Sequence, residues 1–595
     1  MILICALSLA GITGAQTLHV DPAAPFPGAG ASWDDAYTDL QDALDAVRAN
    51  PGAFSEIRLA AGVYTPDRAT RDRDAVFELV PHVAIVGGFA GSSGADPNLR
   101  APHRYRTVLS GDLLANDTAD PASRTDNARR VCAFTGEWGV DQPITLDGVT
   151  ISAGAGDDGD EGSAARFELA HLTLVDCVIS ENRSVDGSAL RLQYCGPLSL
   201  ERVTVIGNTG GGMDADGCWD AAIHASDFVR NTRHEPDRST RGGGLSLRNT
   251  RVTLTDCEIT QNSADRGGGA SLLSGDVTLV STRVAHNTAT TRGGGLEIFS
   301  GETALLRSQI IGNAAGDGAG VSVSSGSLDA VSTLFWANAA DDEGGALHLR
   351  ASFDESSLVS CVLIENTAGA GGAAFSEAPL LLAHCTVWGN HAQTVGGVLD
   401  ETIALTPLAL GSIFWNNSDD SGVSADAQLT STRLVPAQRS FIQAWSAGGT
   451  NSADDPLVQI ITQSATPVPV LLESSPALDH GDTADLPRDL FDLDNDGEEY
   501  EPSPIDYLGA ERTSGPSPDA GAVERAIAPA ADADLTGDGV VGPADLTVLL
   551  SMWGPCPSSS ECPGDLNLDA EVGGGDLTIL LGAWSAIAPP ATGGW

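Results

Sequence analysis

Short apolar segments alternate with polar positions along most of the chain, and similar segments return at intervals of 23 to 31 residues. Between residues 165 and 420 an asparagine follows such a segment ten times. The third residue before each asparagine is apolar, and the fifth is small, β-branched or cysteine. Glycine clusters follow most of them. The ten asparagines are Asn182, Asn208, Asn231, Asn262, Asn287, Asn313, Asn338, Asn366, Asn390 and Asn417.

This repeat predicts a solenoid of parallel strands, because one repeat cannot bury its inward face alone and stacked repeats build a continuous core. Strands of successive rungs would lie about 4.8 Å apart. The asparagines are then expected to stack at one turn, each amide bonding its neighbours above and below. The glycine clusters favour a second turn that needs a positive φ.

One segment near the start has a different period. Apolar residues at spacings of three and four predict an amphipathic helix over residues 33–47, with Asp34 or Asp35 at its N-terminus. We expect this helix to cover the open end of the solenoid, where unpaired strand edges would otherwise promote aggregation. Its apolar positions are Trp33, Tyr37, Leu40, Ala43, Leu44 and Val47.

The apolar run from Ile2 to Ile12 is too short to span a bilayer, which needs about 20 residues. Small residues follow it, so it is interpreted as a secretory signal cleaved after Ala15, with a buried first strand as the alternative. Export would place the protein outside the cell or at the cell surface, where disulfides persist.

The 595 residues carry a net charge of −49, and all 31 basic residues are arginine. Such a chain repels nucleic acid and anionic membranes. The absence of lysine from the sequence also excludes a lysine nucleophile, a Schiff base and a phosphate-loop lysine.

The repeats FVRN (228–231), FWAN (335–338), FWNN (414–417) and GGAL (344–347) resemble those of bacterial polymorphic outer-membrane proteins. The start, from LHVDPAA to LSGD, is similar to secreted right-handed parallel β-helix proteins of the pectin-lyase-like fold. This resemblance covers about residues 17–525 and implies an all-β, right-handed parallel β-helix. Enzymes of that fold are lyases or hydrolases of acidic polysaccharides, but the R-I-K motif of the hydrolases requires a lysine.

Candidate chemistry along the repeats is sparse. Three groups of carboxylates follow strands, and a solvated acidic turn is the alternative explanation for each. These groups are Asp157, Asp158 and Asp160; Asp341, Asp342 and Glu343; and Asp419 and Asp420. The scattered histidines lack metal-ligand spacing and are interpreted as structural or exposed. They include His171, His286, His348 and His384.

Residues 492–497 read D-x-D-x-D-G, the opening of a calcium loop. Asp492, Asp494 and Asp496 would be the ligands. Position 12 is Ser503 rather than an acid, so an unliganded acidic turn remains the alternative.

After an Ala/Pro linker at 526–533, two segments match each other at an offset of 31 residues. Oxygen ligands recur at positions 1, 3, 5 and 12 of a twelve-residue loop, and position 7 would supply a backbone carbonyl, a pattern typical of calcium. The predicted ligands are Asp534, Thr536, Asp538, Val540 and Asp545 in the first loop and Asp565, Asn567, Asp569, Glu571 and Asp576 in the second. Leucines and a tryptophan after each loop predict a helix.

Residues 534–584 resemble a dockerin, of the kind with a W-G-x-C motif, here 553–556. The resemblance implies two calcium ions, a cohesin-like partner and attachment of the β-helix to a scaffold. Loop positions 10 and 11 are Pro543-Ala544 and Gly574-Gly575, which depart from the Ser-Thr type and leave the partner open.

Two disulfides are predicted. Cys556 and Cys562 flank the loop between the two calcium segments. Cys195 and Cys218 both lie 13 residues before a repeat asparagine, which would stack them on adjacent rungs within bridging distance. Cys361 and Cys385 are expected to pack inward as free thiols.

The leading interpretation is an exported β-helix, held by a calcium-dependent dockerin-like tail, that binds glycans or adheres to a surface. The alternative is a polysaccharide lyase or glycoside hydrolase on the same fold, with catalytic residues that the sequence does not identify. The expected parts are a signal (1–15), an N-terminal cap with first rungs (16–125), central repeats (126–430), C-terminal rungs with a closing loop (431–525), the linker, the calcium module (534–588) and a tail (589–595).

Overall fold

The structure is a computed structural model, and it describes most of residues 16–525 and part of the C-terminal module. The gaps in the first part are 119, 158–161, 186, 235–238, 351–353, 402–407, 434–435, 447–448, 464–465, 490, 495 and 499. The described residues of the module are 535–536, 541–556, 562–564, 566, 571–574, 576–577 and 580.

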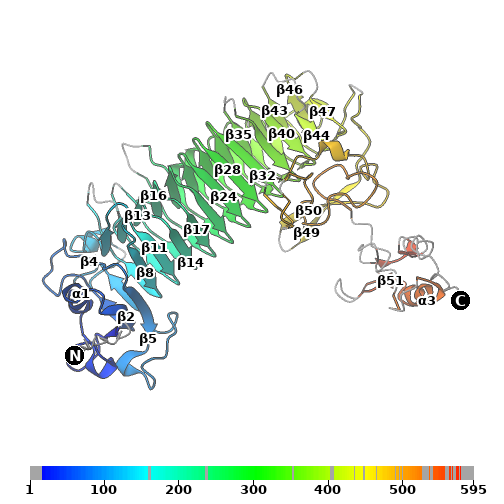
Figure 1. The fold of residues 1–595 in the computed structure, drawn as a ribbon. Coiled ribbons are helices and arrows are strands. Elements are labelled where there is room, and N and C mark those ends of the chain that lie inside the picture. The colour runs from blue at the N-terminus through cyan, green and yellow to red at the C-terminus, as the bar shows by residue number, and fades with distance from the viewer. Residues whose placement is uncertain are drawn as a thin grey trace, which may run out of the picture.

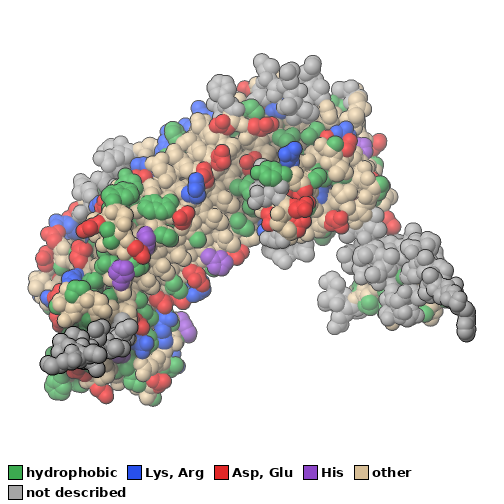
Figure 2. Space-filling view, viewed as in Figure 1, with side chains coloured by type: hydrophobic (Ala, Val, Ile, Leu, Met, Phe, Trp, Pro, Cys, Tyr) green, Lys and Arg blue, Asp and Glu red, His purple; other side chains and the backbone are tan. Residues whose placement is uncertain are grey.

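Three long parallel sheets, A, B and C, run along the axis of the solenoid, and each rung contributes one strand to each sheet (Figure 1). The strands pair in parallel with the equivalent residues of the next rung, as Ile259 does with Val284. A fourth, shorter sheet D forms at the turn that precedes sheet C. Acidic side chains occur along the visible face of the solenoid, with fewer basic ones among them (Figure 2).

Sheet A contains β1 (Gln16–Val20), β2 (Phe54–Ala60), β5 (Ala84–Phe89), β8 (Pro143–Asp147), β11 (His171–Val175), β14 (Leu198–Glu201), β17 (Ala221–His224), β20 (Val252–Thr255), β24 (Asp276–Val280), β28 (Glu302–Leu306), β32 (Ser327–Val331), β36 (Ser356–Val359), β40 (Leu380–Ala383), β44 (Ala409–Leu410) and β47 (Ala437–Gln438). Sheet B contains β3 (Gly62–Tyr64), β6 (Thr107–Ser110), β9 (Val149–Ser152), β12 (Val178–Ser180), β15 (Thr204–Ile206), β18 (Asp227–Val229), β21 (Glu258–Thr260), β25 (Arg283–Ala285), β29 (Gln309–Ile311), β33 (Leu334–Trp336), β37 (Val362–Ile364), β41 (Thr386–Trp388), β45 (Ile413–Trp415) and β48 (Phe441–Ile442).

Sheet C contains β4 (Phe77–Glu78), β7 (Cys132–Thr135), β10 (Ala165–Glu168), β13 (Leu190–Gln193), β16 (Met213–Asp216), β19 (Leu245–Arg248), β23 (Ala270–Leu272), β27 (Leu296–Ile298), β31 (Val321–Val323), β35 (Leu347–Leu349), β39 (Ala374–Ser376), β43 (Val398–Asp400) and β46 (Leu429–Ser431). Sheet D contains β22 (Ser263–Arg266), β26 (Thr288–Arg292), β30 (Ala314–Ala315), β34 (Ala339–Ala340), β38 (Thr367–Ala368) and β42 (His391–Ala392).

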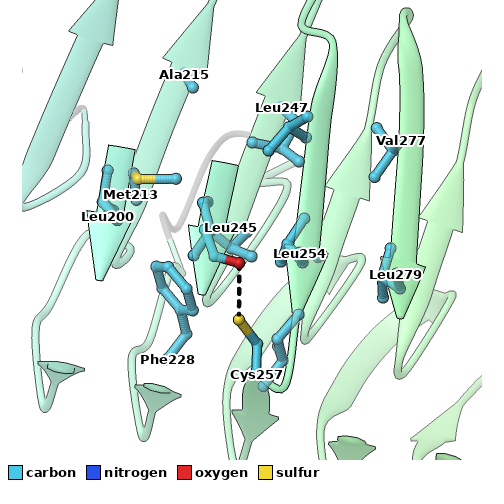
Figure 3. Packing of buried hydrophobic residues seen from close by; sticks show 14 of the residues in the cluster. Leu200, Met213, Ala215, Phe228, Leu245, Leu247, Leu254, Cys257, Val277 and Leu279 are labelled. Atoms are coloured by element: carbon cyan, nitrogen blue, oxygen red, sulfur yellow. Dashed lines mark hydrogen bonds between the residues drawn. The ribbon is translucent and has the colours of Figure 1, made fainter. Parts of the chain in front are cut away.

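The core fills the space enclosed by sheets A, B and C, because alternate residues of every strand point inward. Aliphatic side chains of neighbouring rungs stack in the core, as Leu254 does on Leu279, and Phe228 and Leu245 pack into the same cluster (Figure 3). Cys257 packs among them, and its thiol donates to the carbonyl of Ile223 at 3.4 Å. This column of repeated apolar positions explains why a chain of short strands holds together.

The predicted asparagine stack is confirmed, and all ten asparagines are buried. Asn313 shows the pattern: its Nδ2 donates to Asn338 Oδ1 and to the carbonyl of Val284, each at 3.0 Å. Its backbone N–H donates to the same Asn338 Oδ1. The stack ends at Asn417, which bonds to Gln428 of α2 (Ala425–Gln428) in place of a further asparagine.

The N-terminal helix is shorter than predicted. Helix α1 (Leu40–Ala49) begins seven residues later, because the Asp39 side chain accepts the Gln41 N–H and caps the helix there. Residues Trp33–Asp35 form only one 3₁₀ turn, so Asp34 and Asp35 do not start the helix. The apolar face of α1 joins the main core through Leu40, Ala43, Leu44 and Val47.

Rungs continue only as far as β48, and the chain then reverses over the outside of the solenoid. A hairpin of β49 (Val458–Gln463) and β50 (Thr466–Leu471) opens this segment. Leu493 and Ile505 then pack on outward residues of sheet A, and Tyr507 and Ala522 pack on those of sheet B. The C-terminal segment therefore covers the outer faces of sheets A and B on the later rungs.

The described part of the C-terminal module contains α3 (Pro543–Ser551) and a short antiparallel pair, β51 (Gly554–Pro555) with β52 (Glu571–Val572). Its two halves share one small core, formed by Val541, Leu549, Leu566, Val572 and Leu580. Among the residues that predicted the helix after the first loop, Leu549 is buried in this core, whereas Trp553 is half-exposed beyond the end of α3.

The Cys556–Cys562 disulfide is confirmed, with 5.8 Å between the Cα atoms. Throughout the part of the chain that the structure describes, no helix has the length and apolar character needed to cross a membrane.

Candidate functional site: a polar strip on sheet C

The outer face of sheet C carries polar side chains that are as buried as the core. The middle residue of each short strand points outward, because its two neighbours face the core. Along β23, β27, β31 and β35 these residues are Ser271, Glu297, Ser322 and His348, each at most 1% exposed. A second column precedes them, one residue before each glycine cluster: Arg241, Arg266, Arg292, Asp317 and Glu343. Together these nine residues are called the polar strip.

On either side of the polar strip, outward charges of sheet C are paired. On β16, which precedes the polar strip, Asp214 receives two hydrogen bonds from Arg233, at 2.7 and 3.1 Å. Near the C-terminal end, the buried Asp400 accepts from Arg433 at 2.8 Å. Each of these buried charges is neutralised by a partner within the protein, so we assign both pairs a structural role.

The arginines of the polar strip form fewer ion pairs and hydrogen bonds than Arg233 and Arg433 do. Arg241, Arg266 and Arg292 occupy successive rungs, and their backbones pair in parallel. Among the described residues, neither Arg266 nor Arg292 forms an ion pair, and Arg292 donates only to Ser324 at 3.3 Å. Arg241 approaches Glu297 at 3.5 Å and lies over the Phe299 ring. Three like charges about 4.8 Å apart repel one another, so the column favours an anion.

Buried polar atoms without a hydrogen-bond partner are concentrated here. Native proteins leave few such atoms, and each one needs an explanation. Ser271 donates to one oxygen of Glu297 at 2.8 Å, while the other oxygen has no partner among the described residues. The strip's unpartnered atoms are Arg241 Nη1, Arg266 Nε, Arg292 Nε, Glu297 Oε1, Ser322 Oγ and both ring nitrogens of His348.

Asp317, Glu343 and His348 come together at the C-terminal end of the strip, with one donor atom of each within 4.8 Å of the others. Burial raises the pKa of Asp317, and the neighbouring Asp342 adds to the shift. Burial likewise raises the pKa of Glu343, with a further contribution from Asp317. Burial lowers the pKa of His348 to about 4, and Arg350 contributes in the same direction. The imidazole is therefore neutral at pH 7.

An aromatic pocket of about 420 Å³ lies at the turns between sheets C and A on the earlier rungs. Trp138 and Tyr194 line it with ring centroids 5.4 Å apart, and Trp219 completes the wall. His171 is also part of the lining and pairs with Asp141 at 2.7 Å. Exposed aromatic rings in a concave site are typical of small-molecule and sugar binding.

The structure separates the predicted carboxylate groups. Asp157 pairs with Arg129 at 2.9 Å on the surface, and Asp158 and Asp160 lie outside the described residues. Asp419 accepts hydrogen bonds from its own turn, which favours the solvated-turn alternative. Asp341 and Asp342 are exposed, whereas their neighbour Glu343 belongs to the polar strip. Asp420, the neighbour of Asp419 in the third predicted group, is also exposed.

The histidines singled out in the sequence differ in burial and in their neighbours. His286 is exposed, and the fully buried His384 contacts Arg512 and the carbonyl of Asp519. His348 has no metal-ligand spacing in the sequence, but Asp317 and Glu343 from two rungs lie beside it in the structure. The signal was present in the repeat: Asp317 and Glu343 occupy the register position that Arg241, Arg266 and Arg292 hold in earlier rungs.

The acidic loop at 492–497 brings its three aspartates together, with ligand atoms within 4.8 Å of one another. Glu501, an acid near the loop in the sequence, and Asp489, which the sequence pattern did not single out, also gather around Asp494. Asp492 accepts the Gly497 N–H at 3.1 Å, which holds the loop closed. The residues present therefore suit a hard cation such as calcium.

In the C-terminal module, the aspartate at position 12 of each loop closes that loop. Asp545 accepts the N–H groups of Thr536 and Gly542, at 2.9 and 2.7 Å. Asp576 accepts those of Leu566 and Gly573, at 2.7 and 2.6 Å. Glu571 lies on β52. The other predicted ligands, Asp534, Asp538, Val540, Asp565, Asn567 and Asp569, lie outside the described residues.

The predicted disulfide between Cys195 and Cys218 is not formed, and both are buried free thiols. They do lie on adjacent rungs, where a hydrogen bond between them raises the pKa of Cys218. In-register positions about 4.8 Å apart exceed the 3.5–4.5 Å that a disulfide leaves between Cβ atoms. Cys361 and Cys385 are free and buried, as predicted.

Comparisons with known proteins found one family model and similar solved structures. A family model described as right handed beta helix region matches residues 163–335. A solved structure of the pectate lyase Pel9A matches 87% of this chain and 98% of its own, at 13% identity and a TM-score of 0.30. At that identity and score the activity of the lyase does not carry over. No curated protein matches the chain. The sheets form a parallel β-helix, and residues 163–335 within it are similar to the right handed beta helix family.

Proposed function

We propose that this protein binds an acidic polysaccharide along the polar strip of sheet C. The observation that carries the proposal is the pair Arg266 and Arg292, stacked on adjacent rungs without ion pairs among the described residues. In a chain of net charge −49, carboxylates are abundant, so unpaired stacked guanidinium groups point to an external anion. A polymer with carboxylates at regular intervals suits a column with a regular rung spacing.

Binding of the full chain to polygalacturonate and to a neutral polysaccharide tests this proposal. We expect polygalacturonate binding that weakens as salt rises, and no binding of the neutral polymer. The double variant Arg266→Gln/Arg292→Gln should lose most of the binding. Arg251→Gln is the matched control, because Arg251 is exposed and pairs with Asp276 at 3.2 Å. Equal binding by the double variant and the control would reject the strip as the binding site.

A second candidate function is cleavage of the same polymer, which one observation favours. The Glu343 carboxyl and the neutral His348 imidazole lie 3.5 Å apart, a distance at which one group can exchange a proton with a substrate held by the other. Incubation with polygalacturonate should then release fragments with unsaturated ends, and Glu343→Gln should abolish the release. Binding without any fragments would leave the first function alone.

The C-terminal module is proposed to be dockerin-like, with two calcium ions and a cohesin-like partner. What supports this is the paired design, in which Asp545 and Asp576 close equivalent loops around one shared core. Calorimetry of the full chain should show loss of one calcium ion in Asp545→Ala and of another in Asp576→Ala. Asp496→Asn is the control for a separate site in the acidic loop. Unchanged calcium uptake in both alanine variants would reject the module as a calcium domain.

We further propose that the protein is exported and is held outside the cell by this module. The apolar leader expected at residues 1–15 and the Cys556–Cys562 disulfide support this location. Detection of the mature N-terminus after Ala15 in secreted material would test it. Retention of the protein in the cytoplasm with its leader uncleaved would contradict it.

A further inference from the structure

Asp317, Glu343 and His348 converge although they come from separate parts of the repeat. Asp317 and Glu343 precede the glycine turns of successive rungs, and His348 is the outward residue of β35. The imidazole Nε2 lies 3.5 Å from Glu343 Oε2, without hydrogen-bond geometry. Donors bound tetrahedrally to one zinc ion at about 2.0–2.1 Å lie about 3.3 Å apart, which is close to this separation.

The surroundings of the His348 ring independently indicate a ligand-binding role. It is 1% exposed, and neither ring nitrogen has a hydrogen-bond partner among the described residues. The edge-to-face contact with Phe375, at 5.4 Å between centroids, fixes the plane of the ring. A buried imidazole normally bonds through at least one nitrogen. Here the open nitrogen faces two carboxylates, and this is the usual setting of a metal-ligating histidine.

We propose that Asp317, Glu343 and His348 bind one divalent transition-metal ion of the zinc type. Two carboxylate oxygens and one imidazole nitrogen suit zinc and its first-row neighbours. Calcium is disfavoured, because it takes six to eight oxygen ligands. The ion would also offset the repulsion between the two carboxylates, which lie near each other and are only half-exposed.

Three protein ligands leave a fourth position open, which is the arrangement of catalytic rather than structural zinc sites. Because Asp317 and Glu343 are half-exposed, that position can reach solvent or a bound anion at the end of the polar strip. Metal binding itself does not depend on the proposed polysaccharide binding, and its test uses no polysaccharide.

The experiment uses the untagged full chain, stripped with a chelator and then held in excess calcium to fill the acidic loops. Titration with Zn²⁺ should show one site that calcium does not displace, and Co²⁺ should give a visible spectrum typical of nitrogen and oxygen ligands. His348→Gln and Glu343→Gln should each abolish the zinc site and the metal-induced rise in melting temperature. Asp342→Asn and His286→Gln are matched controls, because both side chains are exposed beside the site or on a nearby rung.

Circular dichroism and the melting temperature without metal separate loss of binding from misfolding in each variant. If His348→Gln does not fold, the Co²⁺ spectrum of Glu343→Gln decides the question. Wild-type protein that takes up no zinc in excess calcium would overturn the proposal. Zinc binding that is unchanged in a folded His348→Gln or Glu343→Gln variant would overturn it as well.

Discussion

The asparagine stack and the polar strip are both buried polar columns that follow the axis of the same solenoid, yet they differ in how their hydrogen bonds are satisfied. Every amide of the stack bonds the next rung, and the Gln428 side chain completes the last one. In the polar strip, guanidinium, carboxylate and imidazole atoms are buried without hydrogen-bond partners among the described residues. Because an unpartnered buried polar atom costs free energy, a column that retains several of them is expected to serve something other than folding.

The two columns also differ in how strictly the sequence repeats. The stack holds the same residue on ten successive rungs, because each asparagine must match the one below it. The second column of the strip, which precedes the glycine clusters, changes from arginine to acid between Arg292 and Asp317. The scaffold tolerates this change because the backbone pairing at that turn is unaffected. Strict repetition therefore marks structure in this protein, and a break in the repeat marks the candidate site.

The largest expected effect is on the stack. Asn313→Ala removes the acceptor of the Asn287 side-chain and backbone N–H groups and the donor to the Val284 carbonyl. At about 1–3 kcal/mol for each buried group left unpartnered, the local free energy of opening should fall by about 3–5 kcal/mol. Hydrogen exchange of the neighbouring rungs measures it, since a long solenoid need not unfold as one unit.

The control is Gln309→Ala, an outward position on the same rung, for which we expect a change within about 0.5 kcal/mol. If both variants behave alike, the hydrogen bonds of the stack contribute little. The contrast between the two columns would then lose its energetic basis.

A third buried polar group lies around Arg512 in the C-terminal segment. It is intermediate between the asparagine stack and the polar strip, because its carboxyl groups accept hydrogen bonds but burial still shifts their pKa values. Burial raises the pKa of Glu524 to about 7, although its carboxylate accepts the N–H groups of Ser514 and Asp519. Because the folded pKa lies above the ordinary value of 4.5, the folded state binds the proton more tightly than the unfolded state. Stability from this group is complete below pH 4.5 and is lost as the pH rises through 7, by up to about 3 kcal/mol.

Denaturation of the C-terminal segment as a function of pH measures this loss, and Glu524→Gln should flatten the curve between pH 4.5 and 7. The curve should not become level, since burial also raises the pKa values of Asp506 and Asp519. Exposed Glu302→Gln is the control, and it should leave the curve unchanged. A curve that rises between pH 5 and 7 would contradict the prediction.

Most of the scaffold could be predicted from the sequence, because a solenoid repeats its physical requirements on every rung. The fixed register of Asn313 with Ile310, and of the other pairs like it, sufficed to place strands, stack and core. The start of α1 could not be placed as well, because the apolar spacing extends upstream of Asp39, which caps the helix. Local capping overrode periodicity there.

The polar strip was harder to predict for a different reason. Its residues are outward-facing, where polar side chains are ordinary, and only the structure reveals that Glu297 and His348 are buried there. The same limit applies to Cys195 and Cys218, which lie on adjacent rungs as predicted but remain free thiols. Register can be read from sequence, but burial of a surface position and the orientation of a side chain require the fold.

The end of the stack should show a smaller effect than its middle. Gln428→Leu keeps the volume but removes the acceptor of the Asn417 N–H and Nδ2 and the donor to its carbonyl. Because this end of the stack can open to water, we expect a loss of about 1–3 kcal/mol, below that for Asn313→Ala. Faster hydrogen exchange confined to β45 and α2 would bear this out, with Gln438→Leu on β47 as the half-exposed control. Acceleration that spreads to the central rungs would show instead that the stack opens as one unit.

The smallest effect on stability is expected in the polar strip, although the same changes should have the largest effect on binding. Arg266→Met and Arg292→Met keep the aliphatic stem and remove a guanidinium that has no ion pair among the described residues. Each should change the free energy of unfolding by no more than about 0.5 kcal/mol, or raise it slightly, because two like charges on adjacent rungs no longer repel. Arg233→Met is the contrasting variant, because Arg233 lies in a turn and is the bidentate partner of the buried Asp214 on sheet C. Its loss leaves Asp214 unpaired there and should cost about 3–5 kcal/mol. Urea denaturation measures the free energy of unfolding of the three variants, and a binding assay measures their affinity for polygalacturonate. If Arg266→Met destabilises the protein as much as Arg233→Met does, the strip is a structural column like the asparagine stack, and its unpartnered atoms do not mark a binding site.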